Sequence, residues 1–154
     1  MTKPEPFTSA LTRLDALERV GMADPAKRAQ LDQVAAAFRV RVTPEMAAVR
    51  SEGVRAQFAP DIRELSVIPE ELADPIGDDA HAPVPGLTHR YKDRAILHAT
   101  KTCEVYCRFC FRRETVGETG HLAEAEFEAV LDYLRATPAV REVIFTGGDP
   151  LVLS

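Results

Sequence analysis

The chain has 154 residues, of which 45% are hydrophobic and 28% charged, and its formal net charge is −5. This composition excludes a disordered chain, and apolar runs of only a few residues exclude a membrane-spanning helix. The acidic balance argues against general attraction to nucleic acid or to an anionic membrane surface. No apolar signal core stands at the amino terminus. We therefore expect a cytoplasmic protein with no nucleic-acid or membrane partner, in which three cysteines stay reduced.

Apolar periodicity predicts three helices in the amino-terminal region, residues 1–57. The first covers 8–21, with Thr8 or Ser9 as its cap and Gly21 at its end. The second begins at Asp24-Pro25 and continues to Phe38, and the third begins at Thr43-Pro44-Glu45. We interpret their apolar stripes as helix packing, since nothing in this region indicates a reaction.

A proline-rich stretch follows, between Phe58 and Pro85, and predicts an extended, turn-rich connection with a short helix near Glu70 to Leu72. Residues 95–99 then form a predicted buried strand, 121–136 a helix and 142–146 a second strand. A strand, a helix and a strand within about 50 residues predict a right-handed βαβ unit with parallel strands. The fold class is therefore α/β.

All three cysteines, Cys103, Cys107 and Cys110, lie in one C-x3-C-x2-C segment after the first predicted strand. Three thiolates on one loop suit a 4Fe-4S cluster and leave one iron without a protein ligand, which is where chemistry can occur. Two other interpretations stay open: thiols of an ordinary packed segment, and a structural zinc site. Zinc needs a fourth ligand, for which the candidates are His81, His89, His98 and His121. An odd number of cysteines argues against a disulfide framework.

Basic residues gather around this cysteine segment, whereas most acidic residues lie elsewhere. They are Arg90, Lys92, Arg94, Lys101, Arg108, Arg112 and Arg113. A basic site in an acidic protein suits an anionic ligand such as a phosphate or a carboxylate. A Gly-Gly-Asp-Pro turn at 147–150 follows the second strand at the end where βα folds bind ligands.

Three segments resemble the radical S-adenosylmethionine enzymes, and the lysine 2,3-aminomutase family in particular. They are the cysteine segment with its flanking residues, Leu-Thr-His-Arg-Tyr-Lys-Asp-Arg at 87–94, and the Gly-Gly-Asp-Pro turn. The resemblance runs from about Thr43 to the last residue. It implies that the proline-rich linker (58–94) carries a segment for the phosphate of pyridoxal phosphate and that residues 95–154 are the start of a partial (βα)6 TIM-like barrel. The helical amino-terminal region (1–57) rests on apolar periodicity. Because only one βαβ unit is present, we expect a truncated barrel.

The resemblance also implies a role for particular residues. Cys103, Cys107 and Cys110 would hold the 4Fe-4S cluster, and S-adenosylmethionine would occupy the open iron. Phe109 would pack near its adenine, and Gly147, Gly148 and Asp149 would receive its amino group. Arg90, Tyr91 and Arg94 would hold the phosphate of pyridoxal phosphate. Arg112 would receive the carboxylate of the amino acid substrate.

The implied reaction is the conversion of L-lysine to β-lysine by 2,3-amino migration, an isomerase reaction that needs a reductant such as flavodoxin or ferredoxin. The 154 residues look like the amino-terminal part of such an enzyme, so we expect them to be inactive alone. Alternatives are a noncatalytic, truncated 4Fe-4S-binding product, an aminomutase for another amino acid such as glutamate, and an enzyme acting on a lysine destined for elongation factor P. The helical first 50 residues suit a subunit contact, so a homo-oligomer is one expectation.

Overall fold

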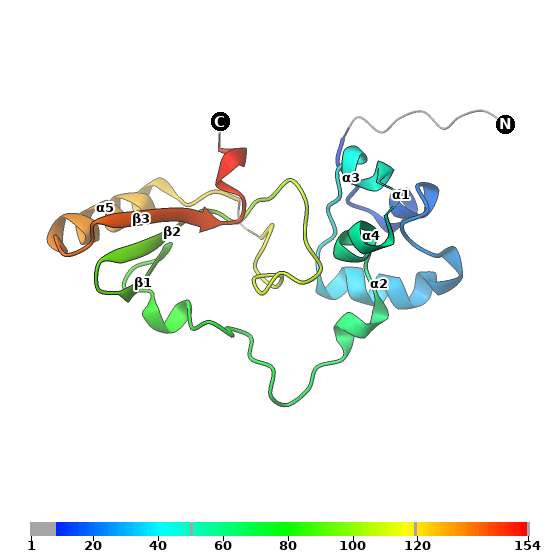
Figure 1. Ribbon diagram of the computed structural model, residues 1–154, viewed down its shortest axis with the longest axis horizontal. Coiled ribbons are helices and arrows are strands. Elements are labelled where there is room, and N and C mark those ends of the chain that lie inside the picture. Colours follow the sequence, from blue (N-terminus) through cyan, green and yellow to red (C-terminus); the bar gives the residue numbers. More distant parts are fainter. Residues whose placement is uncertain (1–8, 50, 119, 154) are drawn as a thin grey trace. The chain divides into compact units, whose positions relative to one another are not determined.

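The computed structural model describes residues 9–49, 51–118 and 120–153 (Figure 1). The chain forms two compact units. The helical unit comprises Met1–Glu71 together with Glu104–Glu114, and the sheet unit comprises Leu72–Cys103 together with Thr115–Ser154. The chain therefore leaves the sheet unit after Cys103, within the cysteine segment, and returns to it at Thr115. The predicted three-part division at 57/58 and 94/95 stays a prediction.

Short helices make up the helical unit. They are α1 (Leu14–Arg19), η1 (Pro25–Lys27), α2 (Arg28–Ala37), α3 (Pro44–Ala48), α4 (Glu52–Phe58) and η2 (Ile62–Leu65). Two predicted starts are confirmed by their caps. The Asp24 carboxylate accepts a hydrogen bond from the Ala26 N–H, and the Thr43 hydroxyl accepts one from Met46, each with proline in the first turn.

Several predicted boundaries in this unit are wrong. The first helix begins only at Leu14, because Leu11 forms an antiparallel bridge with Val42 whose backbone hydrogen bonds measure 2.7 and 3.0 Å. Thr8, one of the two caps that we predicted, lies outside the described residues, and Ser9 precedes the helix by several residues. Long-range backbone pairing thus overrides the helical periodicity at this end.

Helices α4 and η2 were not predicted, since neither carries a long apolar stripe. Conversely, no helix forms near Glu70 to Leu72, where the chain makes a turn closed by a hydrogen bond from the Glu71 N–H to the Ile68 carbonyl. Residues 66–73 are all exposed, so a helix there would have nothing to pack against.

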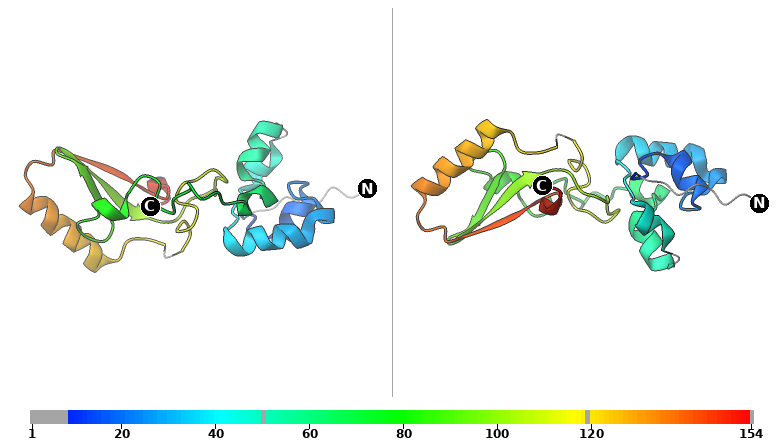
Figure 2. Two further views of the ribbon diagram at one scale, coloured as in Figure 1. Left: turned by 90° about the horizontal axis from the view of Figure 1, so that it is seen from below. Right: turned by 90° about the horizontal axis from the view of Figure 1, so that it is seen from above.

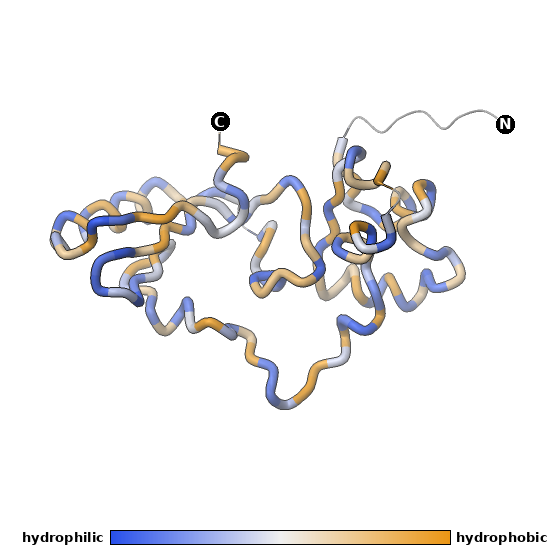
Figure 3. The backbone as a smooth tube through the Cα atoms, viewed as in Figure 1, coloured by the Kyte–Doolittle hydropathy of each residue, from blue (hydrophilic) through white to orange (hydrophobic). Residues whose placement is uncertain are grey.

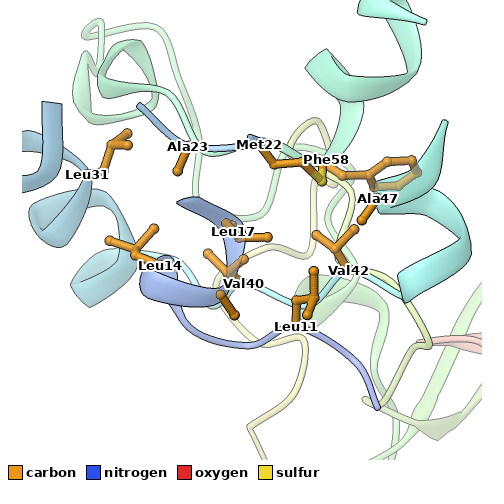
Figure 4. Close-up of a cluster of buried hydrophobic side chains, with 11 residues drawn as sticks. Leu11, Leu14, Leu17, Met22, Ala23, Leu31, Val40, Val42, Ala47 and Phe58 are labelled. Atoms are coloured by element: carbon orange, nitrogen blue, oxygen red, sulfur yellow. The ribbon is translucent and has the colours of Figure 1, made fainter. Parts of the chain in front are cut away.

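One apolar cluster forms the core of the helical unit (Figure 4). Leu17 and Val42 are fully buried at its centre, and Phe58 from α4 closes it. The remaining members are Leu11, Leu14, Ala16, Met22, Ala23, Leu31, Val40 and Ala47. Val105 and Cys107 of the cysteine segment pack against this cluster, so the core supports the segment directly.

The sheet unit contains β1 (Leu87–Tyr91), β2 (Arg94–Thr100), α5 (Glu124–Ala136) and β3 (Glu142–Gly147), with short turns η3 (Asp79–His81) and η4 (Pro150–Val152). The strand order is β1-β2-β3; β1 pairs antiparallel with β2, and β2 pairs parallel with β3. The predicted strand-helix-strand order with parallel strands is confirmed. Strand β1 was not predicted as a strand. Right-handedness and the assignment to a partial (βα)6 barrel stay predictions.

Helix α5 covers one face of this sheet (Figures 1 and 2). Leu87, Ala95 and Leu97 from the strands meet Val130 from the helix, and each is at most 2% exposed. Strand β3 carries a continuous apolar run that is visible in Figure 3. Its Ile144 and Phe145 are 43% and 56% exposed, so this strand is incompletely covered. No helix in the described part of the chain has the length and apolarity needed to cross a membrane.

Candidate functional site

The carboxyl ends of β2 and β3 bring two of the predicted motifs together. The Gly148 N–H donates to the Thr100 carbonyl at 2.5 Å, and the Asp149 N–H donates to the Thr102 carbonyl at 2.9 Å. The Gly-Gly-Asp-Pro turn therefore lies against the residues that lead into Cys103. This is the edge where parallel strands of βα folds present ligand-binding loops.

Both glycines of this turn are required by geometry. Gly147 has φ +106°, which disfavours any residue with a side chain, and a Cβ there would lie 3.1 Å from the Cα of His98. Gly148 has no such φ, but a Cβ there would lie 2.7 Å from the carbonyl carbon of Thr102. The backbone of the turn can approach Thr100 and Thr102 only because both side chains are absent.

Asp149 stabilises the next turn with its carboxylate. Its Oδ1 accepts a hydrogen bond of 3.0 Å from the Leu151 N–H and caps η4. The capping bond fixes the orientation of the carboxylate beside the glycine turn. Its predicted role as the acceptor for an ammonium group stays a prediction.

Thr100, the last residue of β2, is hydrogen-bonded to both ends of the loop that carries the cysteines. It is fully buried, and its hydroxyl lies 3.0 Å from the Thr102 nitrogen, 3.0 Å from His121 Nδ1 and 3.3 Å from the Gly120 carbonyl. The Lys101 N–H adds a backbone hydrogen bond of 2.7 Å to the same Gly120 carbonyl. Thr100 was not among the predicted site residues, because a single threonine at a strand end carries no distinctive signal in the sequence.

Among the described residues the three cysteines form no disulfide, and each is of intermediate exposure. Cys103 belongs to the sheet unit, whereas Cys107 and Cys110 belong to the helical unit. A turn joins the latter two, with a hydrogen bond of 3.1 Å from the Cys110 N–H to the Cys107 carbonyl. Burial, followed by the nearby Cys110, raises the pKa of the Cys107 thiol above its ordinary value.

Three cysteine thiols can ligate three of the four irons of a 4Fe-4S cluster, so the chemistry of these residues fits such a cluster with one iron left open. The raised pKa of Cys107 means that a bound cation would favour the thiolate that burial alone disfavours. Within the described ranges, no group of three or more His, Cys, Asp or Glu side chains is arranged as a metal site. The assignment of the cluster to Cys103, Cys107 and Cys110 stays a prediction.

Backbone hydrogen bonds hold the segment 104–114 in the helical unit. The Tyr106 N–H donates to the Arg41 carbonyl and the Arg108 N–H to the Gln57 carbonyl, each at 2.8 Å. The Arg41 guanidinium in turn donates to the Glu104 carbonyl at 3.2 Å. Two separate parts of the helical unit, at Arg41 and at Gln57, thus fix a loop that the sequence alone presents as long and irregular.

The sequence predicts a basic site for an anionic ligand, but some arginines of this segment already contact other side chains of the helical unit. Arg108 forms a buried ion pair with Glu64, in which the two side chains are 8% and 10% exposed and the shortest N–O distance is 2.6 Å. The Arg113 guanidinium lies over the ring of Phe38, 4.2 Å from its centroid. Arg112 lies over Phe111 at 4.3 Å. Its predicted role toward a substrate carboxylate stays a prediction.

Phe109, between Cys107 and Cys110, is 70% exposed. A ring with this exposure offers its faces for stacking on a flat heterocycle. The expected contact with adenine is untested and stays a prediction.

The residues predicted to hold the phosphate of pyridoxal phosphate, Arg90, Tyr91 and Arg94, lie around the β1–β2 turn. Tyr91 and Arg94 are paired across the turn, and the Arg94 guanidinium is 3.3 Å from the Asp93 carboxylate and 3.6 Å from that of Glu142. Arg90 approaches Gly77, where a Cβ would lie 3.4 Å from its guanidinium.

Arg94 begins β2 and Thr100 ends it. Six residue steps of strand separate the predicted phosphate residues from the glycine turn by about 20 Å. The structure therefore places these two parts of the predicted site at opposite ends of β2.

Residues 97–154 match the family described as the radical SAM superfamily. A match to this superfamily implies a 4Fe-4S cluster and S-adenosylmethionine as cofactors. The chain is 43% identical to the L-lysine 2,3-aminomutase of Clostridium subterminale over 105 residues, 68% of this chain and 25% of that protein.

Two further relatives align over 96% of this chain and 36% of their own length, each at 29% identity. They are an L-lysine 2,3-aminomutase from Methanococcus maripaludis and a glutamate 2,3-aminomutase from Clostridioides difficile. The chain thus spans between about a quarter and a third of the length of these curated relatives.

Proposed function

This chain belongs to the radical SAM superfamily, among the relatives of lysine 2,3-aminomutase, and on that basis we propose that it forms the cluster-binding, amino-terminal part of a 2,3-aminomutase. The observation that carries the proposal is the meeting of two motifs at one strand end. The Gly-Gly-Asp-Pro turn is hydrogen-bonded to Thr100 and Thr102, immediately before the first of the three cysteines.

In this proposal Cys103, Cys107 and Cys110 would hold a 4Fe-4S cluster. Such a cluster, when bound together with S-adenosylmethionine, would provide one-electron and radical chemistry. The backbone at Gly147 and Gly148 gives the methionine part of that molecule a close approach, and the Asp149 carboxylate accepts hydrogen bonds from its ammonium group. The exposed ring of Phe109 covers the adenine.

Arg90, Tyr91 and Arg94 are proposed to hold the phosphate of pyridoxal phosphate. Two guanidinium groups and a phenol are good phosphate partners, and a phosphate would compete with the carboxylates that Arg94 contacts. Arg112 is proposed to receive the carboxylate of the amino acid substrate through a two-pronged hydrogen bond.

We propose L-lysine as the substrate, with β-lysine as the product. The support is the 43% identity to a lysine enzyme over 105 residues; the 29% identity to the glutamate enzyme comes from a longer alignment of 153 residues. Glutamate remains the alternative, because the archaeal lysine enzyme and the glutamate enzyme match this chain equally well over nearly its full length. A flavodoxin or ferredoxin is the proposed reductant, and the proposed assembly is a homo-oligomer.

We further propose that the 154 residues alone do not complete the catalytic cycle, since they span only part of their relatives. A second candidate function, a noncatalytic cluster-binding module, is favoured by this same fraction. Formation of β-lysine from lysine by the purified chain, supplied with S-adenosylmethionine, pyridoxal phosphate and a reductant, would contradict the proposed inactivity.

Anaerobic reconstitution with iron and sulfide tests the proposed function. We expect about four irons per chain and an electron paramagnetic resonance signal of the reduced cluster that changes when S-adenosylmethionine is added. The triple variant Cys103→Ser, Cys107→Ser, Cys110→Ser is the control and should bind no cluster. Stoichiometric zinc without iron would instead support a zinc site, and a cluster whose signal ignores S-adenosylmethionine would reject the radical chemistry.

A further inference from the structure

We propose that Glu64 and Arg108 are positioning residues for the cluster ligands. Their buried ion pair fixes the peptide between Cys107 and Cys110 and so determines where these two sulfurs lie. This inference rests on the proposed function in one respect, namely that these sulfurs bind a cluster. The observations that support it are the contacts of Arg108 with Glu64 and with the backbone of the helical unit, which do not depend on a cluster.

The ion pair has the form of a two-pronged clamp. Arg108 Nε lies 3.0 and 3.2 Å from the two carboxylate oxygens of Glu64, and Nη2 lies 2.6 Å from Oε2. The remaining guanidinium nitrogen, Nη1, donates to the Arg39 carbonyl at 2.8 Å. All three nitrogens of the guanidinium group are therefore used inside the helical unit.

Glu64 is itself held in place from the other side. Its Oε1 accepts a hydrogen bond of 2.9 Å from the Asp61 N–H, and the Asp61 carboxylate returns one to the backbone, which makes a capping box around η2. The carboxylate thus belongs to a rigid turn and not to a freely rotating side chain. The turn therefore holds the Glu64 carboxylate independently of its contact with Arg108.

Arg108 transmits this position to the cysteines because it stands directly after Cys107 and two residues before Cys110. Its own N–H is bonded to the Gln57 carbonyl, so both its side chain and its backbone are anchored. Cys107 packs against the core on the same segment. Moving the turn would require the pair to separate, which would leave a charged group unpaired where side chains are only 8–10% exposed.

A purely stabilising ion pair would not need this arrangement. An arginine between two cluster ligands serves the geometry of the turn, because the planar guanidinium fork matches a carboxylate in one orientation, whereas a lysine ammonium does not. The variant Arg108→Lys keeps the charge and removes the fork, and Glu64→Gln keeps the shape and removes the charge.

The test uses the full 154-residue chain under anaerobic conditions. The first measurement is the rate at which iodoacetamide alkylates Cys107 in cluster-free protein, followed by mass spectrometry with Cys103 as the internal reference. In Arg108→Lys and in Glu64→Gln we expect Cys107 to react about tenfold faster than in the unmodified chain, because the buried pair no longer restrains the turn. The second measurement is iron content and the cluster's electron paramagnetic resonance signal after reconstitution, where we expect loss of iron and an altered signal.

Arg63→Lys is the matched control. Arg63 lies in η2 next to Glu64 and pairs with Asp61, but its side chain is 86% exposed. The alkylation rate of Cys107 and the iron content of this variant should therefore equal those of the unmodified chain. Circular dichroism checks that each variant is folded. The inference is overturned if folded Arg108→Lys and Glu64→Gln behave like Arg63→Lys in both measurements. If the unmodified chain binds no iron, the proposed function fails, and the alkylation rates alone then decide whether the pair positions the turn.

Discussion

Adjacent glycines at the end of β3 restrict the chain for different reasons. Gly147 requires a backbone conformation with positive φ, whereas Gly148 adopts an ordinary φ and is restricted only by its closeness to Thr102. The two restrictions can therefore be separated by substitution. Both glycines allow the turn to lie against Thr100 and Thr102, the residues that lead into the cysteine loop.

Replacing Gly148 with alanine should destabilise the protein by about 2 kcal/mol, because the new methyl group overlaps the Thr102 backbone and one of the two segments must shift. Chemical denaturation measures the free energy of unfolding. Gly53→Ala is the control: Gly53 lies within α4, where a Cβ would come no closer than 4.0 Å to the Ser51 hydroxyl. We expect that variant to be more stable by about 0.5–1 kcal/mol. Equal effects of the two substitutions would contradict this prediction.

Asp61 gives the protein an acid-sensitive contact beside Glu64. The side-chain hydrogen bond from Arg63, followed by the Arg63 backbone N–H, lowers the pKa of Asp61 from 3.8 to about 2. A carboxylate whose pKa is lowered by folding contributes stability that is present above pH 3.8 and is lost as the pH falls toward 2.

The variant Asp61→Asn should therefore differ most from the unmodified protein above about pH 4, with the difference shrinking between pH 4 and pH 2. The side chain of Asp61 is 44% exposed, so we expect a difference below about 1 kcal/mol. Denaturation at a series of pH values measures it. A difference that stays constant down to pH 2 would show that the Arg63 contact does not act on this carboxylate.

Strand β2 connects the parts of the sheet unit that matter for the site. Its amino end carries Arg94 and its carboxyl end carries Thr100, whose hydroxyl and carbonyl together meet the cysteine loop, its return at Gly120, and the glycine turn. The closure of the loop therefore depends on the end of this one element.

Replacing Thr100 with valine preserves the shape of the side chain and removes the hydroxyl. We expect a loss of about 1–3 kcal/mol, because the Thr102 N–H and the His121 ring are left without this partner in a buried place. Thermal and chemical unfolding measure the loss. Thr146→Val on β3 is the matched control, since no side-chain hydrogen bond joins Thr146 to another described residue, and it should change stability by less than about 0.5 kcal/mol. Similar losses in both variants would contradict the assignment.

The molecule as a whole is divided in a way that does not follow the chain. Residues 104–114 belong to the helical unit, although the strands on either side of the loop belong to the sheet unit. The two units are also joined through residues 66–77, where Val67, Ile68 and Leu72 are 55–68% exposed. Exposed, irregular backbone of this kind opens most easily.

A glutamate-specific protease at low concentration should therefore cut first after Glu70 or Glu71, and only later after Glu124 or Glu128 of α5, whose backbone is hydrogen-bonded in a helix. Mass spectrometry of the early products identifies the first cut. Initial cleavage within α5 would contradict this division into ordered units and an exposed connection.

Much of this arrangement was predictable from the sequence. The caps at Asp24 and Thr43, the strand at 95–99, the helix that follows the loop and the parallel second strand all come from local patterns, because capping and apolar periodicity act over a few residues. The three cysteines stood out by their spacing, and the Gly-Gly-Asp-Pro turn stood out by its place directly after the second predicted strand.

Only the tertiary structure decided which distant residues meet. The ion pair between Glu64 and Arg108 joins residues 44 positions apart, and the hydrogen bond from the Thr100 hydroxyl to the Gly120 carbonyl joins residues 20 positions apart. The bridge from Leu11 to Val42 likewise joins distant residues. The capping box of Asp61 and Glu64 was not predicted, and the buried arginine partner of Glu64 carries no local signal in the sequence. The physical reason is that local pattern fixes the conformation of a segment, whereas burial determines which charges and hydroxyls must find partners elsewhere in the chain.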